Sequence, residues 1–254
     1  MEFKIGDIVS RNSYNNDVVF EIINIEGNIA LLKGTCIRLY ADSPLSDLVI
    51  CDDRDEYSPN YDFSHMNRDE YFYMPGKILH IDGDDDYLKK SLDFYKKTGV
   101  AAIGKTIKES EVPLILDKLL HEYKPDILVI TGHDAYYDKN DNGGNKGMYK
   151  NSKYFIKAVQ IARDFEKSHE KLVIIAGACQ SDYENIIKSG ANFASSPKRV
   201  NIHALDPAVI AVNVALTDKK QELDIKDLLS KTKYGKNGIG GLMGNGMMYI
   251  GYPR

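Results

Sequence analysis

Short apolar runs alternate with segments of helical spacing between residues 77 and 177, and this alternation limits the fold more than any other feature of the sequence. The runs are KILHI, GVAAIG, DILVIT and KLVIIAG, and helical spacing occupies residues 84–97, 109–123 and 152–168. Apolar runs of this length between helices are typical of a parallel sheet that helices cover on both faces. We therefore predict an α/β domain over residues 76–254, with right-handed crossovers.

The first 51 residues have a different pattern. They are rich in Val and Ile, and the runs KIGDIVSR, DVVFEIINIE, NIALLKGTCIRLY and LSDLVI read as short strands. Turn signals at Asn15-Asn16 and Glu26-Gly27-Asn28 separate them. We predict a small β-barrel over residues 1–51 that resembles an SH3-like fold. Residues 52–75 are acidic and aromatic without an apolar period, which predicts a linker.

Composition excludes several function classes. The 254 residues carry a net charge of −4, so no basic footprint for nucleic acid is present. No apolar run approaches the roughly 18–20 residues that span a bilayer, and the N-terminus MEFKIGDIVS lacks an apolar signal region. Cys36, Cys51 and Cys179 are too few for a disulfide framework, and the absence of CxxC argues against a structural zinc site. We expect a reduced, cytosolic compartment with no nucleic-acid or membrane partner.

Two loops present reactive side chains where strong strands end. ILVI is followed by Thr131-Gly132-His133-Asp134, and LVII by Ala176-Gly177-Ala178-Cys179. Ligands of open parallel sheets bind at the carboxyl ends of the strands. If the two strands are neighbours, His133 and Cys179 project into one crevice.

The residues after Cys179 match a capping box, with Ser181 as the cap and Glu184 three positions later. This pattern predicts a helix that begins immediately after Cys179. A thiol near a helix N-terminus has a lowered pKa and a larger thiolate fraction. A thiolate and an imidazole in one crevice are the parts of a nucleophilic acyl-transfer site.

Structural roles compete with this hypothesis. A buried cysteine packs as a small hydrophobe, and a lone histidine in a strand-end loop is often a hydrogen-bonded surface residue. His203 lies just before the predicted helix start Asp206-Pro207 and is the main rival to His133. The acidic run Asp82–Asp86 lacks the spacing of a calcium loop, so we interpret it as a helix cap. The residues alone leave a cysteine hydrolase and a non-catalytic protein both open.

The succession of apolar strand and His, then apolar strand and Ala-Cys, resembles the caspase–hemoglobinase group of cysteine peptidases. More narrowly, the chain resembles the YabG family of sporulation-specific proteases from residue 3 to residue 253. The matching stretches are FKIGDIVSRNSYNNDVVFEI, ALLKGTCIRLYADSPLSDLV, DILVITGHDAYY, IIAGACQSDYENII and YGKNGIGGLMGNGMMYIGYP.

The resemblance implies a caspase-like fold and a cysteine endopeptidase that works in the cytoplasm of a sporulating cell, associated with the developing spore coat. Its implied substrates are coat and cortex-associated proteins and the chain itself. His133 and Cys179 would be the catalytic dyad. The backbone N–H groups of Cys179 and Asp134 would stabilise the oxyanion, and no third catalytic residue, metal or cofactor is implied.

Two positions depart from the wider group. Asp134 follows the histidine where caspases and clostripain have Gly, and Gly177 stands where clostripain-like enzymes carry an acid for a basic P1 side chain. If cleavage follows Arg or Lys, Asp134 and Asp182 are the candidate substrate-binding carboxylates. A first-turn helix acid is the competing interpretation of Asp182.

Cleavage of the chain itself would fall in the predicted linker, after Arg54 or Arg68. Two alternatives keep the fold without the peptidase. One is a scaffold with a degenerate caspase-like domain that binds coat proteins, and the other is a small-amide hydrolase with the same dyad.

Overall fold

The computed structural model describes residues 3–52, 57–64, 66–137 and 148–253. The chain forms two compact units, Met1–Ser58 and Pro59–Arg254. The boundary between them falls inside the segment 52–75 that the sequence predicts as a linker. Near the end of this segment lies a strand that the sequence analysis did not foresee, β6 (Phe72–Met74), which pairs antiparallel with β15 (Tyr249–Gly251).

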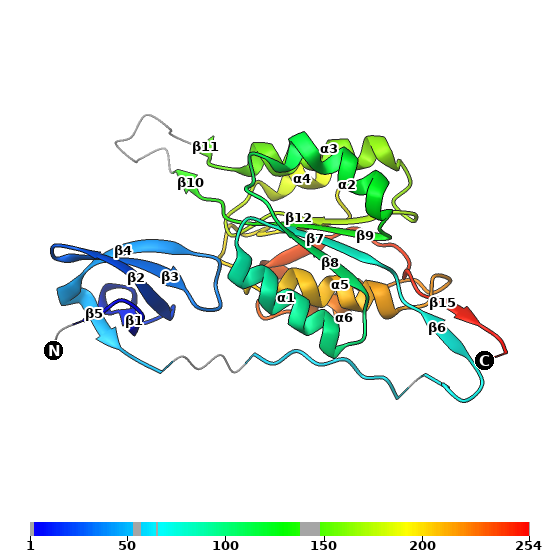
Figure 1. Ribbon diagram of the computed structural model, residues 1–254, viewed down its shortest axis with the longest axis horizontal. Helices are drawn as coiled ribbons and strands as arrows, with labels where there is room; N and C mark the ends of the chain where they lie inside the picture. The colour runs from blue at the N-terminus through cyan, green and yellow to red at the C-terminus, as the bar shows by residue number, and fades with distance from the viewer. Residues whose placement is uncertain (1–2, 53–56, 65, 138–147, 254) are drawn as a thin grey trace. The chain divides into compact units, whose positions relative to one another are not determined.

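The first unit is an antiparallel sheet of five strands in the order β4-β3-β2-β1-β5 (Figure 1). The strands and the two short 3-10 helices are β1 (Ile8–Arg11), η1 (Asn12–Tyr14), β2 (Phe20–Glu26), β3 (Ile29–Gly34), β4 (Tyr40–Pro44), η2 (Leu45–Asp47) and β5 (Leu48–Ile50). Phe20 and Ile22 alternate with exposed neighbours on β2, and their side chains are fully buried. Gly27 has a φ of +62° in the turn between β2 and β3, which confirms the predicted turn.

One strand prediction in this unit is wrong. The run NIALLKGTCIRLY was expected as a single strand, but β3 ends at Gly34 and β4 starts at Tyr40. The Gly34 N–H donates to the Leu39 carbonyl at 2.7 Å. A side chain at Gly34 would collide with the carbonyl oxygen of Ile37. The chain therefore doubles back at a position that glycine alone fits.

The second unit contains a six-stranded sheet in the order β14-β13-β12-β9-β7-β8. Neighbouring strands pair in parallel except for β13 and β14, which are antiparallel. Figure 1 shows α2, α3 and α4 on one face and α1, α5 and α6 on the other. The predicted parallel sheet with helices on both faces is confirmed except at β14, which pairs antiparallel with β13.

The elements of this unit have the following bounds. The sheet contains β7 (Ile78–Asp82), β8 (Ala102–Thr106), β9 (Ile127–Thr131), β12 (Val173–Ala176), β13 (Phe193–Ser195) and β14 (Ile239–Gly241). The helices are α1 (Asp85–Lys97), α2 (Val112–Tyr123), α3 (Ser152–Phe165), α4 (Tyr183–Lys188), α5 (Asp206–Leu216), α6 (Ile225–Ser230) and η3 (Gly235–Asn237). A two-stranded ribbon joins β10 (Tyr136–Tyr137) and β11 (Met148–Tyr149).

Burial explains why these segments adopt their structures. All five residues of β7 and of β9 are buried, as expected for strands covered on both faces. All eleven residues of α5 are buried too, because this helix is apolar on nearly every side. The Asp84 carboxylate accepts from the N–H groups of Asp86 and Tyr87, which confirms the predicted cap of α1. Within the described residues, no helix is both long enough and apolar enough to cross a membrane.

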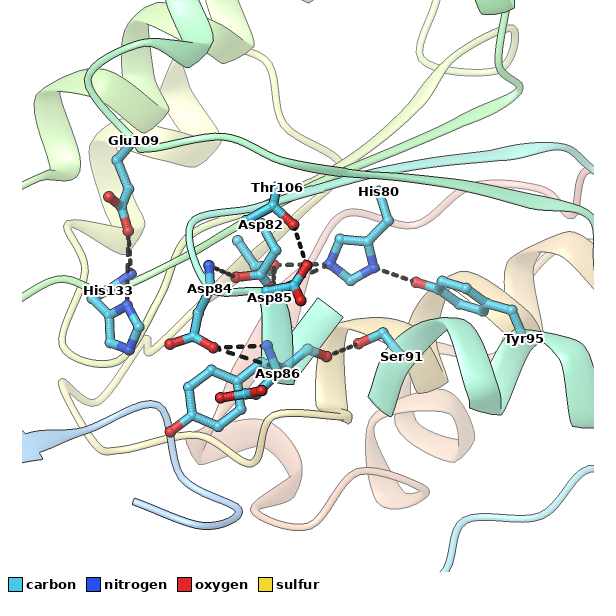
Figure 2. Close-up of polar contacts among 12 residues, drawn as sticks. His80, Asp82, Asp84, Asp85, Asp86, Ser91, Tyr95, Thr106, Glu109 and His133 are labelled. Carbon is cyan, nitrogen blue, oxygen red and sulfur yellow. Dashed lines mark hydrogen bonds and ion pairs between the residues drawn. The ribbon is translucent and has the colours of Figure 1, made fainter. Parts of the chain in front are cut away.

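A buried polar network fixes the end of β7 against β9 and α1 (Figure 2). His80 Nδ1 lies 2.8 Å from the Tyr95 hydroxyl, and its Nε2 lies 2.8 Å from Thr131 Oγ1. Thr131 Oγ1 in turn donates to Asp82 Oδ2 at 2.7 Å. None of these four residues is more than 1% exposed. Polar groups this deep stabilise the fold only while they are hydrogen-bonded, so the network holds these elements in one arrangement.

Replacing Thr131 by Val tests the network. The isosteric side chain removes the hydroxyl that the buried Asp82 carboxylate accepts from, whereas Thr131→Ser keeps it. We expect Thr131→Val to be less stable than Thr131→Ser by about 1–3 kcal/mol, the cost of a lost buried hydrogen bond. Urea unfolding of the full chain measures the difference, and equal stabilities would show that the hydroxyl contributes nothing.

Candidate active site at the carboxyl edge of the sheet

The strands that precede His133 and Cys179 are neighbours. β9 and β12 pair in parallel, with Ile130 opposite Ala176. His133 and Cys179 each follow their paired residue by three positions. The Gly177 N–H donates to the Ile130 carbonyl at 3.0 Å, so the pairing continues into the first residue of the cysteine loop. Both loops therefore leave the same edge of the sheet at the same level.

A tight turn holds Cys179. Ser181 Oγ accepts from the Ala178 N–H at 2.5 Å and donates to the Ala178 carbonyl at 2.7 Å. The Ile202 N–H lies 3.2 Å from Cys179 Sγ and donates to it. A backbone donor in this position stabilises negative charge on the sulfur. The Cys179 side chain is buried, with 1% of its surface exposed.

The helix after Cys179 begins later than predicted, and a different residue caps it. α4 starts at Tyr183, and its cap is Asp182, whose carboxylate accepts from the Asn185 N–H. The predicted capping box of Ser181 and Glu184 is wrong, because the Ser181 hydroxyl is engaged with Ala178 in the preceding turn. The observed cap, Asp182, therefore lies one position closer to the helix than the predicted cap, Ser181.

His133 is anchored through its backbone on both sides. Its carbonyl accepts from Asn151 Nδ2 at 2.7 Å, and its N–H donates to Glu109 Oε1, also at 2.7 Å. The same carboxylate oxygen lies 3.9 Å from His133 Nδ1 (Figure 2). The Tyr87 ring packs against the imidazole at a centroid distance of 5.8 Å. These contacts hold His133 in place, and 20% of its side chain remains exposed.

Asp134 connects the histidine loop to α3. Its Oδ1 accepts from the N–H groups of Ala135 and Asn151, and its Oδ2 accepts from Ser152 Oγ in a short hydrogen bond. Burial raises the pKa of Asp134, although the bonds from Ser152, Asn151 and Ala135 oppose the shift. The Asp134 carboxylate thus accepts three hydrogen bonds from groups of the protein itself.

The histidine and cysteine loops are linked through one hydroxyl. Ser152 Oγ donates to Asp134 and accepts from the Asp182 N–H at 2.8 Å. Asp134 follows His133 directly, and Asp182 belongs to the turn that follows Cys179. This bridge restrains the two loops relative to each other.

A pocket of about 480 Å³ lies beside the cysteine turn. Its walls come from the start of α4 and from the loop after β13, and they carry the acids Asp182 and Glu184 and the bases Lys198 and Arg199. The pocket carries as many bases as acids, so its charge alone does not favour a basic P1 side chain of a substrate. The predicted substrate-binding role of Asp182 stays a prediction, as does that of Asp134.

The rival histidine is built into the start of α5. His203 is 3% exposed, and its Nδ1 accepts from the Leu205 N–H at 3.1 Å. This contact ties the His203 ring to the turn that leads into α5. Among the residues that the structure describes, no group of three or more His, Cys, Asp or Glu could hold a metal ion.

Sequence reasoning missed Glu109 and Ser152. Both lie at the start of predicted helices, where acids and serines are common for local reasons, so nothing in their spacing singles them out. Gly83 and Gly132 each directly follow a strand, but only the structure shows that a side chain at either would collide with the Glu109 carboxylate.

The protein is thus of the α/β class, with a mainly parallel sheet whose carboxyl edge, where ligands of such sheets bind, carries the histidine loop and the cysteine loop side by side. The family model described as YabG peptidase U57 matches residues 4–68 and 51–253. The sporulation-specific protease YabG of Bacillus subtilis (strain 168) is 41% identical over 288 residues, which span 100% of this chain and 99% of that protein. The chain belongs to the YabG peptidase family.

The raised pKa of Asp134 predicts how stability depends on pH. Above the ordinary value of 3.8 and up to the raised pKa, the folded state binds more protons at this carboxyl than the unfolded chain does. The free energy of unfolding therefore falls as the pH rises through this window. Asp134→Asn removes the titration. We expect the stability of the wild type relative to Asp134→Asn to decrease as the pH rises above about 4 in urea unfolding. A relative increase over that range would contradict the assignment.

Proposed function

We propose that the chain is a cysteine endopeptidase whose catalytic dyad is Cys179 and His133. The observation that carries the proposal is their equal offset beyond the paired residues Ile130 and Ala176. Adjacent parallel strands deliver a thiol and an imidazole to one edge of the sheet, as acyl transfer requires.

In the proposed mechanism, the Cys179 thiolate attacks the carbonyl carbon of the scissile peptide bond. His133 carries the proton that the thiol has lost and gives it to the leaving amine as the C–N bond breaks. Water then adds to the acyl-enzyme, with His133 as the base, and releases the acid and the thiolate.

The oxyanion would be stabilised by the backbone N–H groups of Cys179 and Asp134. The structure bears on the second donor because the His133 N–H already donates to Glu109. We therefore assign the second oxyanion donor in the segment His133–Asp134 to the N–H of Asp134.

The finer fold and the biological role are part of the same proposal. We propose that the second unit has a caspase-like fold, supported by the histidine after β9 and the cysteine after its neighbour β12. We propose an SH3-like fold for the five-stranded sheet of the first unit. The similarity to the sporulation-specific protease YabG of Bacillus subtilis supports a role in sporulation. Proteins of the spore coat and cortex are the proposed substrates, and the cytoplasm of the sporulating cell, at the developing coat, is the proposed location.

One observation favours a second candidate, the non-catalytic scaffold that binds coat proteins. Cys179 is 1% exposed and accepts a hydrogen bond from Ile202, as a structural cysteine would. A peptide carbonyl reaches this sulfur only if substrate binding uncovers it. The two functions therefore differ in whether Cys179 reacts.

Activity of dyad variants decides between them. We expect Cys179→Ala and His133→Ala each to lower kcat/KM by about 1,000-fold or more, because the two side chains act as a unit. The substrates are spore-coat extract and a diverse peptide library, with cleavage read by mass spectrometry. His121→Ala is the matched control, since the His121 side chain is 65% exposed and lies on α2.

Alkylation gives an independent measure. We expect iodoacetamide to modify Cys179 near neutral pH and to abolish cleavage. Full activity in Cys179→Ala would refute the peptidase mechanism. An unmodified thiol in a protein that cuts nothing would establish the scaffold instead.

The residue before each cut tests the hypothesis of a basic P1 preference. If Asp182 receives an Arg or Lys side chain, Asp182→Asn lowers kcat/KM for such sites by about 10- to 100-fold. Asn caps helices about as well as Asp, so α4 is retained. Glu184→Gln, in the same pocket, is the control. An unchanged P1 profile in Asp182→Asn would remove this residue from the specificity site.

The same mass spectra will show whether the chain cuts its own predicted linker after Arg54 or Arg68. Arg68 is exposed, whereas Arg54 lies outside the described residues.

A further inference from the structure

Glu109 lies in the segment before α2 (Val112–Tyr123), yet its carboxylate reaches the candidate active site. Oε1 accepts from the His133 N–H at 2.7 Å and lies 3.9 Å from His133 Nδ1. The Glu109 side chain is 14% exposed, so its charge is poorly screened by water. Figure 2 shows the carboxylate pointing at the backbone and the ring of His133.

Two glycines make room for this carboxylate. Gly83 follows β7 and Gly132 follows β9, and a Cβ at either would collide with Glu109 Oε1. The Glu109 Cδ atom would lie 2.8 Å from a Cβ at Gly83 and 2.9 Å from one at Gly132, which is too close for carbon atoms. The Gly83 N–H also donates to the Thr131 carbonyl at 3.1 Å, which closes the gap between the strands. The carboxylate is therefore seated between two strand ends at a defined place.

We propose that Glu109 is the positioning residue of His133: its carboxylate fixes the backbone of the histidine and holds the imidazolium form that the dyad needs. This inference rests on the proposed function. A base oriented by a third group is the general arrangement of nucleophilic sites, and here the third group lies on the Nδ1 side of the ring.

Other groups around His133 bear on its charge as well. Tyr87 of α1 packs against the ring, Asp134 is the next residue, and Cys179 is the proposed partner from the neighbouring loop. The Asp134 carboxylate is occupied by Ser152 and by two backbone N–H groups. Among the contacts described for this ring, Glu109 is the acid whose carboxylate oxygen lies within 4.0 Å of an imidazole nitrogen.

Glu109→Gln separates the charge from the hydrogen bond. The amide oxygen still accepts from the His133 N–H, but the negative charge beside Nδ1 is lost. We expect kcat/KM to fall by about 10- to 100-fold, chiefly through kcat. The alkaline limb of its pH profile should move by about one pH unit toward lower pH, because the imidazolium loses a nearby anion. The rate of Cys179 alkylation should move in parallel.

Glu111→Gln is the matched control, since Glu111 is an exposed acid two residues along the same segment. We expect it to leave both the rate and the pH profile unchanged. Glu109→Ala loses the hydrogen bond as well as the charge, so it should be less active than Glu109→Gln.

Gly83→Ala provides a second test that leaves His133 and Glu109 chemically intact. The new methyl group displaces the Glu109 carboxylate, so activity should fall in the wild-type background. In Glu109→Ala the methyl group meets no carboxylate, and the same substitution should have little further effect. Such non-additivity identifies the carboxylate as the group through which Gly83 acts.

The outcomes distinguish this inference from the proposed function. If Cys179→Ala retains cleavage, the dyad fails and the role of Glu109 fails with it. If both dyad variants are inactive while Glu109→Gln keeps the wild-type rate and pH profile, only the role of Glu109 is overturned. Equal effects of Gly83→Ala in both backgrounds would also overturn it, because the glycine would then act on the strand rather than on Glu109.

Discussion

The parallel pairing of β9 with β12 is the constraint on which the candidate site depends. Four residue pairs, from Ile127 opposite Val173 to Ile130 opposite Ala176, set the register. A parallel pair shifted by one residue would reverse the face of every side chain on one strand. Both strands are fully buried, so such a shift would disturb the core as well as the site. The register thereby sets how far each loop extends beyond the sheet.

Polar contacts then convert loops into a defined site. On the histidine side, Glu109 and Asn151 hold the backbone of His133, and on the cysteine side Ser181 closes the turn. Ser152 joins the two sides, through Asp134 and the N–H of Asp182. Each of these contacts is short, and each joins segments that are distant in the sequence or closes a turn. Loops restrained in this way lose little further freedom when a substrate binds, which is the advantage of preorganisation.

Much of the fold could be predicted because its signals are local. Apolar runs of strand length identified β7, β9 and β12, and the acid and proline at Asp206-Pro207 marked the start of α5. The errors are also local. Gly34 interrupts a run that looked continuous, since its close approach to Ile37 arises only when the chain turns back. Ser181 resembled a helix cap, but its hydroxyl hydrogen-bonds to Ala178 and Asp182 caps α4 instead.

The sequence by itself determined which side chains leave the sheet at β9 and β12, because hydrophobic patterning identifies the strands and whatever follows them must emerge at the carboxyl edge. Tertiary structure alone decided what surrounds His133 and Cys179. Glu109 meets His133 across 24 residues, and Ser152 meets Asp182 across 30, through crossovers whose packing no local pattern encodes. Hydrogen bonds form between groups that folding brings within about 3 Å. Periodicity specifies which face of an element is buried, but not which residue of another element lies opposite it.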